Sequence, residues 1–362
     1  MKLLHKSSFL TTLFFLPLAL AIFGVFFVFE ASSIRSLSEY GESFRYAKLQ
    51  LLWIVIGFIT MAVVSKIDYH KWYYFAFLMM GGTIMLLVAV LIPALGHSAG
   101  GARRWIDLGF FNLQPTEFAK VASIIYLSSW FIHRERKRFF SFLILLCILM
   151  GLIMLQPDMG TAIIIFSLSI GIYFLAGIEL HYLLYFLPVS VAAFLLMVKL
   201  SPYRFQRLTA FLNPDENTQG VAYHIHQVLI SLTNGGLWGQ GFGASRQKYL
   251  FLPEAHTDSI FAIIGEEIGF IGSIGLIIAF IVLIYQLFKI SEMAPDRFGR
   301  LLAGGIFVFF SLQIIVNLGS MVSIMPMTGV PLPFISYGGS NLLTSFFLAG
   351  VAINIGRQSK MS

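Results

Sequence analysis

The stretch 247–269, QKYLFLPEAHTDSIFAIIGEEIG, holds the richest set of potentially reactive side chains in the sequence. A polar loop with His256 and Asp258 runs there directly into an apolar segment, which contains Glu266 and Glu267. A carboxylate at such a boundary can act as a general base, because partial removal from water raises its pKa, although nearby cations lower it. We therefore predict Asp258 as the base. An alternative stays open, since Asp is also a favoured cap for a helix that begins here.

Three further ionisable residues fall within apolar segments or at their ends. Glu117 and Lys120 are three residues apart, so on a helix they share a face and can pair. Ionisable residues inside a membrane are costly and are candidates for function, although a self-compensating pair could serve structure alone. Asp158, in QPDMGT, could contact substrate or could cap the following helix.

Basic residues gather in two loops that we place on the same side of the membrane as Asp258. Arginine forks suit phosphate and pyrophosphate, so these loops favour a phosphorylated substrate embedded in the membrane, and the alternative is ordinary solvated charge. His256 could contact that substrate or could be a turn residue. The basic residues are Arg103, Arg104, Arg204, Arg207, Arg246 and Lys248.

The sequence offers little for a metal or a nucleotide. His224 and His226 are two residues apart, and such positions on a helix do not face each other. With no third ligand in view, we predict no metal site there. Walker A, HExxH and cysteine-based metal motifs do not occur. The expected chemistry therefore needs only an activated substrate and a base.

The composition indicates that lipid is the solvent of this chain. Of 362 residues, 58% are hydrophobic and 11% are charged, and the mean hydropathy is +0.84, whereas soluble domains carry about 25% charged residues. The net charge of +7 matters less than where Lys and Arg lie. The first apolar run, near residues 9–29, exceeds the core of a signal peptide and is not followed by an A-x-A site, so we expect a retained span.

The elements that must position these residues are membrane-spanning helices. We expect an all-α polytopic membrane protein with about ten transmembrane helices, forming one integral membrane domain over residues 1–362. Placing the N- and C-termini in the cytoplasm puts most Lys and Arg inside, as the positive-inside rule requires. The run RERKR, 134–138, is the strongest anchor, interpreted as a cytoplasmic loop without chemistry. At roughly 20 apolar residues per span, the spans lie near 9–29, 49–65, 72–93, 117–133, 139–156, 161–178, 181–199, 259–288, 300–325 and 337–356.

One large extracytoplasmic loop, residues 200–258, separates spans seven and eight. Loops of this length are usually functional. Its middle, VAYHIHQVLISLTNGGLWGQG, alternates apolar and polar residues and predicts an amphipathic surface helix. The glycines from Gly235 to Gly243 then predict a tight, irregular turn.

Taken together, the motifs resemble those of the SEDS family (shape, elongation, division and sporulation proteins) of membrane glycosyltransferases. The chain is more similar to the division branch, FtsW, than to the elongation branch, RodA, and PEAH in particular points to the former. It differs from the common pattern at AYHIHQV, 222–228, and at Ser259. The matching segments are GARRWIDLG with QPTEFAK (101–120), QPDMGT (156–161), YRFQRL with NP (203–214), LWGQGFG with QKYLFLPEAHTD (237–258), FAIIGEEIG (261–269) and PLPFISYGGSNLL (331–343).

This resemblance implies a reaction. The family polymerises lipid II into glycan strands, and Asp258 takes the position of its essential carboxylate. Asp258 would deprotonate the 4-hydroxyl of one sugar, which attacks C1 of the other and expels undecaprenyl pyrophosphate. An α-linked donor that gives a β-linked product is inverted, and a single displacement needs one base. By the same resemblance Arg104, Trp105, Glu117 and Lys120 line the extracytoplasmic cavity.

The resemblance also implies partners and a location. Arg204 and Arg207 would contact the pyrophosphate, and a divalent cation, Mg²⁺ or Mn²⁺, is the one cofactor left open. The protein would work with a class B penicillin-binding protein, a transpeptidase, and with other membrane proteins of the division complex, but not with nucleic acid. It would lie in the bacterial cytoplasmic membrane, at the division septum.

Two other functions compete with the polymerase. A lipid II flippase would place charges at the membrane midplane and would show paired broken helices. Here the polar residues gather at one face and no repeat is evident, although Glu266 and Glu267, two turns into span eight, fit transport best. A non-catalytic division scaffold would tolerate Asp258→Asn.

Overall fold

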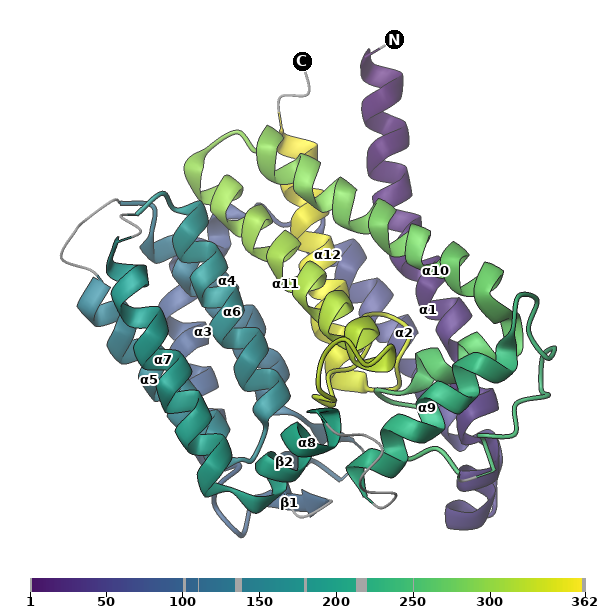
Figure 1. Ribbon diagram of the computed structural model, residues 1–362. Helices are drawn as coiled ribbons and strands as arrows, with labels where there is room; N and C mark the ends of the chain where they lie inside the picture. The colour runs from purple at the N-terminus through teal and green to yellow at the C-terminus, as the bar shows by residue number, and fades with distance from the viewer. Residues whose placement is uncertain are drawn as a thin grey trace.

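The computed structural model describes residues 2–99, 102–109, 111–133, 139–178, 181–212, 220–249 and 251–359. The basic run at 134–138 and the NP pair at 213–214 lie outside these ranges. The described chain forms helices joined by short connections, with one small sheet (Figure 1). The elements are α1 Lys2–Tyr40, α2 Arg45–Val64, α3 His70–Ala89, β1 Gly96–Ala99, β2 Ala102–Asp107, β3 Asn112–Leu113, α4 Pro115–Trp130, α5 Phe139–Leu155, α6 Met159–Leu175, α7 His181–Leu200, α8 Pro202–Leu212, α9 Val221–Gly235, α10 Ile260–Met293, α11 Arg297–Met321 and α12 Gly339–Gln358.

Helix α12 lies at the centre of the bundle. It contacts α1, α2, α4, α10 and α11, and 83% of its apolar window is buried, against 22% for α3. Small residues allow this close approach, as is common between helices in membranes. A Cβ on Gly350 would lie 2.8 Å from the carbonyl oxygen of Met61 in α2, so the α2–α12 contact requires glycine there.

The helices fit a multi-pass membrane protein. Among the described residues, six helices are long and apolar enough to cross a membrane: α1, α2, α3, α10, α11 and α12. The shorter helices α5 and α6 are also apolar. Each of the ten expected spans falls on one helix, from α1 to α7 and from α10 to α12. The number of crossings remains a prediction.

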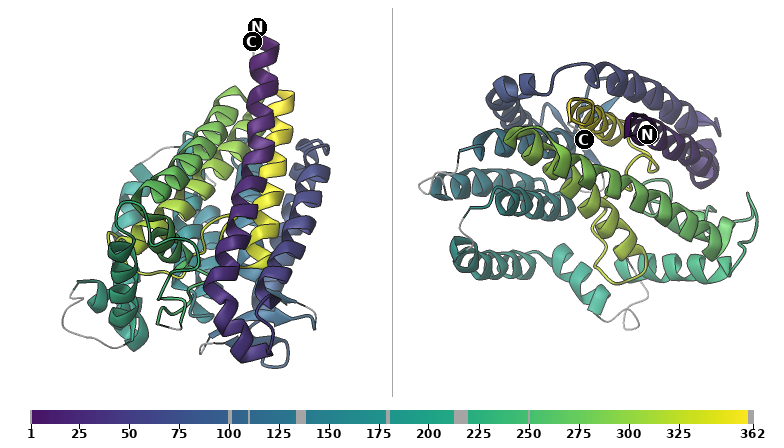
Figure 2. Two further views of the ribbon diagram at one scale, coloured as in Figure 1. Left: turned by 90° about the vertical axis from the view of Figure 1, so that its right-hand side faces the viewer. Right: turned by 90° about the horizontal axis from the view of Figure 1, so that it is seen from above.

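The two ends of the bundle differ. Helix α1 begins and α12 ends at one end, which we call the inner end, while the sheet, α8 and α9 lie at the other, the outer end (Figures 1 and 2). The sheet has the order β1-β2-β3, with antiparallel pairing throughout. At its second turn, Gly109 has φ +87° and its amide donates to Asp107 Oδ1 at 2.8 Å.

The sheet corrects one expectation, that the protein is all-α. Segment 96–113 is too short and too polar to span a membrane, and its backbone groups pair with one another as strands instead. The predicted helix in the large outer loop is confirmed as α9, and the glycine-rich turn follows it. Helix α8, in the same loop, was not expected.

Helix α9 is amphipathic, as its pattern predicts. Ala222, Ile225, Val228 and Ser231 are buried at helical spacing. This face packs against α10. The Ser231 hydroxyl donates to the Ala262 carbonyl at 2.9 Å, so α9 is fixed to the start of α10, directly after the predicted base.

Candidate functional site

Asp258 ends the PEAHTD loop, residues 253–258, one residue before the cap of α10. The loop is tightly turned: the amides of Thr257 and Ser259 donate to the Glu254 carbonyl at 3.1 and 3.3 Å, and Glu254 has φ +48°. Ser259 is the N-cap of α10, and its side chain makes no capping hydrogen bond. The N-cap position is therefore Ser259 and not Asp258.

The carboxylate of Asp258 faces a second loop. Its Oδ1 accepts a hydrogen bond from the Thr257 hydroxyl at 3.2 Å. Its Oδ2 faces Gly329, where an added Cβ would lie 3.7 Å away. Gly329 belongs to the α11–α12 loop, residues 323–338, and has φ +72°, which favours glycine. The α11–α12 loop thus forms one wall of the site.

One buried amide holds the two loops together. Asn317 of α11 is 1% exposed. Its Nδ2 donates to the backbone carbonyl of Asp258 and to that of Val330, each at 2.8 Å. One side chain thereby sets the position of the Asp258 backbone and of the wall that Asp258 faces. Asn317 is not among the residues predicted from the sequence, although a polar residue within a predicted span is a signal of function.

The surroundings of Asp258 suit a base near neutral pH. Burial, followed by the negative charge of Glu254, raises the pKa of Asp258 to about 6, although Arg207 and the Thr257 hydroxyl act in the opposite direction. A base works best when its pKa lies near the working pH. Burial also lowers the pKa values of His224 and His256 to about 4, so both imidazoles are neutral at pH 7.

Three of the predicted arginines hold backbone turns around this site. Arg207 donates to the Met327 carbonyl, in the α11–α12 loop, at 3.1 Å. Arg204 donates to the Met154 carbonyl at 3.0 Å, and Arg104 donates to the carbonyls of Gln156, at 3.3 Å, and Pro157. A guanidinium has five N–H donors, so an arginine can hold a turn and still reach a substrate oxygen.

Asp158 caps α6, which is one of the two roles predicted for it. Its Oδ1 accepts from the Thr161 amide at 3.2 Å and its Oδ2 from the Thr161 hydroxyl at 2.8 Å. The capped turn abuts the α11–α12 loop, because a Cβ on Gly160 would lie 2.3 Å from the Thr328 carbonyl oxygen. The turn that Arg104 and Arg204 hold is therefore next to the loop that faces Asp258.

Glu117 and Lys120 form a buried ion pair in α4. Lys120 Nζ lies 2.7 Å from Glu117 Oε1, and each side chain is 2% exposed. The Thr344 hydroxyl of α12 lies 3.4 Å from Glu117 Oε2. Two buried side-chain amides also bind in this region. The Gln313 amide donates to the Asn341 side chain at 3.0 Å and to the Pro331 carbonyl, in the α11–α12 loop, at 2.9 Å.

The remaining predicted residues take other positions. Arg103 is exposed on β2, and Trp105 is partly buried opposite His97. Lys248 pairs with Glu30 at 2.9 Å and donates to the Gly243 carbonyl at 2.7 Å. The ring of His256 packs on Tyr46 and Tyr337, with centroids 4.8 and 5.6 Å apart. The structure gives neither Lys248 nor His256 a contact with the Asp258 carboxylate.

Glu266 ties the large outer loop to α10. Its Oε2 accepts from the hydroxyls of Ser245, at 2.5 Å, and Ser231, at 3.3 Å. Its Oε1 lies 3.4 Å from the Arg246 amide. These hydrogen bonds with the loop account for the Glu266 carboxylate two turns into an apolar helix. A transport role is not needed to explain it. Within the described ranges, no group of three His, Cys, Asp or Glu side chains could hold a metal ion.

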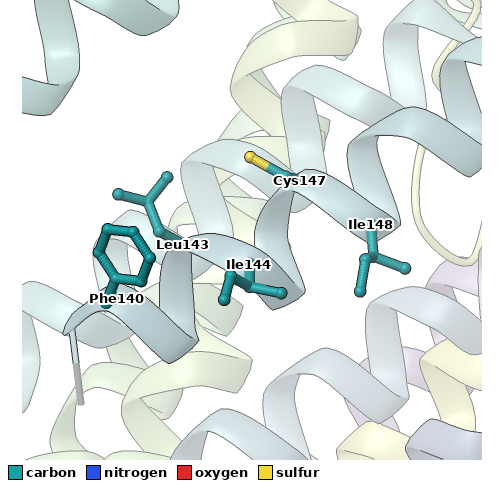
Figure 3. Close-up of a pocket in the computed structure, with 5 residues that line it drawn as sticks. All are labelled: Phe140, Leu143, Ile144, Cys147 and Ile148. Carbon is teal, nitrogen blue, oxygen red and sulfur yellow. The ribbon is translucent and has the colours of Figure 1, made fainter.

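Two cavities beside the described helices are apolar. One, of about 720 Å³, lies between α10 and α11 and is lined by residues such as Phe270, Ile277 and Leu318. The other, of about 450 Å³, lies along α5, where Phe140, Leu143, Ile144, Cys147 and Ile148 line it (Figure 3). Neither is lined by Asp258.

Comparison with known proteins agrees with the motifs. The family model FTSW_RODA_SPOVE, described as "Cell cycle protein", matches residues 10–361. A "Probable peptidoglycan glycosyltransferase FtsW" of Trichlorobacter lovleyi is 39% identical, over 97% of this chain and 93% of that protein. "Stage V sporulation protein E" of Bacillus subtilis is 37% identical, over 95% of this chain and 96% of that protein.

Solved structures share the fold. A chain in a structure described as "Structural coordination of polymerization and crosslinking by a peptidoglycan synthase complex" superposes with a TM-score of 0.76, at 26% identity, over 95% of this chain and 96% of that one. The rod shape determining protein RodA of Thermus thermophilus superposes with a TM-score of 0.70, at 24% identity, over 96% of each chain. The latter likeness is one of fold alone.

Proposed function

The chain belongs to the FtsW/RodA/SpoVE family of cell cycle proteins, and from that premise we propose that it is a peptidoglycan glycosyltransferase that joins lipid II units into glycan strands. Its relatives of 36–39% identity, named FtsW peptidoglycan glycosyltransferases, support the activity. The observation that carries the site is Asp258, a partly buried carboxylate with a pKa of about 6 at the outer end of the bundle.

Asp258 acts as the general base in this proposal. It takes the proton of the attacking sugar hydroxyl while the oxygen of that hydroxyl forms a bond to C1 of the donor. The bond between C1 and the pyrophosphate oxygen breaks, and the pyrophosphate leaves with the lipid. The bond that breaks is that of an activated donor, so no nucleotide or redox cofactor is required. One base is sufficient for a single inverting displacement.

Three other outer carboxylates, Asp158, Glu117 and Glu254, support this choice because each has another contact. Asp158 caps α6 through Thr161. Glu117 is paired with Lys120. Glu254 is exposed and contacts Thr257. Asp258 has no cation within 4.0 Å among the described residues, so its charge is left for the reaction.

The arginines would bind the pyrophosphate leaving group. Arg104, Arg204 and Arg207 hold the α5–α6 turn and the α11–α12 loop, and they bring guanidinium groups to the outer end, where a pyrophosphate would lie. Guanidinium groups bind phosphate oxygens in pairs of hydrogen bonds, so these residues would stabilise the departing charge. A divalent cation would bind the pyrophosphate of the substrate itself.

The setting follows from the same family. The chain is a multi-pass membrane protein, and we place both termini in the cytoplasm, ten spans in the membrane and the Asp258 site outside. The single domain covers residues 1–362. The match to a chain of a peptidoglycan synthase complex supports a penicillin-binding protein as partner, and the FtsW relatives support the division septum as its place.

The test is polymerisation of labelled lipid II by the purified full chain, with and without a transpeptidase partner whose own active site is blocked. We expect glycan strands whose new linkages are β, as inversion requires. Strands of α linkage would contradict the single displacement. Movement of lipid II across sealed vesicles without strand formation would contradict the polymerase and would favour the flippase.

A further inference from the structure

Helix α10 is broken near the outer end of the bundle. Gly269 has φ +70° and ψ −169°, far from helical values, and divides α10 into an outer part, residues 260–268, and a long inner part. A break within a membrane helix leaves backbone groups that need partners. The 236–243 loop, which follows α9, supplies them.

The loop pairs with the break on both sides. The amides of Gln240 and Gly241 donate to the carbonyls of Glu266 and Glu267 at 2.9 and 3.0 Å. In return, the amides of Phe270 and Ile271 donate to the carbonyls of Gly236 and Leu237 at 2.9 and 3.2 Å. The loop and the break form one hydrogen-bonded unit.

Close backbone contact makes this unit rigid. A Cβ on Gly239 would lie 2.1 Å from the Glu267 carbonyl oxygen, and one on Gly269 would lie 2.2 Å from the Gly239 amide nitrogen. Neither glycine can take a side chain without moving the backbone. The loop and the break must therefore lie at the same depth in the membrane.

Helix α1 shows what that depth is. Its long apolar run ends at Phe29, and the charged Glu30 follows. The ring of Phe242 lies 6.1 Å from that of Phe27, and Lys248 pairs with Glu30. The loop therefore lies level with the outer limit of the apolar part of α1, where hydrocarbon gives way to headgroups.

The loop exposes large apolar side chains at this level. Leu237, Trp238 and Phe242 are 63%, 79% and 76% exposed. Phe270 and Ile271, directly after the break, are 59% and 49% exposed and continue along the apolar surface of α10. Trp and other aromatic residues are enriched at the boundary between membrane and water.

We propose that the 236–243 loop is a membrane-surface anchor, with Trp238 and Phe242 inserted among the outer-leaflet lipids. The occupant of this surface is bulk lipid at the level of the headgroups. Continuity with the exposed apolar side of α10 and the contact with the end of the α1 apolar run support lipid over a protein partner.

The anchor has a consequence for the site, which rests on the proposed function. Residues 260–268 form a rigid helical segment between the anchored break and Asp258, about 13 Å long at 1.5 Å per residue. The anchor fixes the Gly269 end of this segment at the membrane surface. It thereby sets the height at which Asp258 meets the sugar of a lipid-linked substrate.

The experiment measures the surroundings of Trp238 in the full-length protein, reconstituted in phosphatidylethanolamine and phosphatidylglycerol nanodiscs. The chain has 5 tryptophans, so the emission lost on Trp238→Phe isolates the signal of Trp238 and keeps an apolar anchor. We expect this signal to be quenched by lipids brominated near the headgroup and to be insensitive to iodide in the water. Trp53→Phe is the matched control, because Trp53 packs against Phe111 and Gly339.

Two results would overturn the anchor. Quenching of Trp238 by iodide but not by brominated lipid would place the loop in water, and protection from both would indicate a surface covered by protein. A second measurement keeps the test open if Trp238→Phe does not fold. Nitroxide labels at Phe242→Cys and Gln240→Cys, in a Cys147→Ser chain, should report lipid oxygen at 242 and water at 240. Neither readout requires polymerase activity, so failure of the anchor and failure of the proposed function are distinguishable.

Discussion

Asp258 differs from the other carboxylates of the outer end in its surroundings. It is partly buried, faces the neutral backbone of Gly329 and lies near the negative charge of Glu254. Each of these features favours its protonated form, which is why its pKa rises to about 6. Below that pH the base is protonated and inactive, and above it the base is ionised.

The pH dependence of polymerisation should therefore show an acidic limb with its midpoint near 6. The histidines do not contribute, because the pKa values of His224 and His256 are about 4. Glu254→Gln should move the midpoint to lower pH, since it removes a negative charge that raises the pKa of Asp258. Initial rates at saturating lipid II, measured between pH 5 and 8, test this. A midpoint that Glu254→Gln leaves in place would contradict the assignment.

Asn317 should act as a positioning residue for Asp258. Asn317→Leu removes both hydrogen bonds that hold the Asp258 and Val330 carbonyls. A displaced base can lower the rate by about a hundredfold, so we expect kcat to fall while KM changes little. Gln313→Leu is the matched control, because Gln313 lies one turn away and binds Pro331 and Asn341, not Asp258. Equal losses of kcat in both variants would indicate a structural role only.

The sequence identified part of the site and missed the rest for a physical reason. Asp258, Asp158 and the Glu117–Lys120 pair are recognisable because their chemistry is unusual for their local setting. Asn317 and Gly329 act through contacts with residues distant in the chain, such as the hydrogen bond from Asn317 to Asp258. Polarity in a predicted span can mark Asn317 as notable, but only the fold shows which carbonyls it holds.

At the scale of the elements, the break in α10 requires glycine at position 269. Gly269→Ala places a Cβ 2.2 Å from the Gly239 amide at a φ of +70°. Backbone strain of this kind costs about 1–3 kcal/mol, so the variant should unfold at a lower temperature. Gly275→Ala, in the same helix, meets nothing within 4 Å and should be neutral or slightly stabilising. Thermal unfolding of both in one detergent tests this, and equal midpoints would contradict it.

The elements that local patterns could predict are the helices. Apolar length predicts helices over the expected spans, and amphipathic spacing predicts α9 with its glycine-rich turn. The sheet at 96–113 and helix α8 were not expected, because strands this short and a helix of this polarity depend on tertiary partners. Arg204 and Arg207 of α8 show such dependence, since they bind carbonyls of α5 and the α11–α12 loop.

For the whole molecule, the inner end is held by polar contacts among three separate segments. Asn354 of α12 donates to the Ser65 carbonyl at 3.0 Å and accepts from the Tyr69 amide at 2.9 Å. The Tyr69 hydroxyl donates to Asp296, just before α11. Helix α1 begins and α12 ends at this end, whereas the sheet, α8 and α9 lie at the other (Figures 1 and 2), so the topology is open to a direct test.

We expect opposite labelling of the two ends by an impermeant maleimide in spheroplasts, in a Cys147→Ser background. Asp107→Cys, at the exposed last residue of β2, should label in intact spheroplasts. Lys66→Cys, exposed between α2 and α3, should label only after permeabilisation. The reverse pattern would invert the topology and would place the Asp258 site in the cytoplasm.

The central claim is that Asp258 is the base of glycan polymerisation, and Asp258→Asn tests it most directly. The variant should fold at least as well as the wild type above pH 6, because it removes a charge that the fold disfavours. We expect the partner-bound wild type to make glycan strands from lipid II, Asp258→Asn to make none, and Asp158→Asn, which can keep its cap, to retain activity. Strands from a folded, partner-bound Asp258→Asn protein would contradict the account.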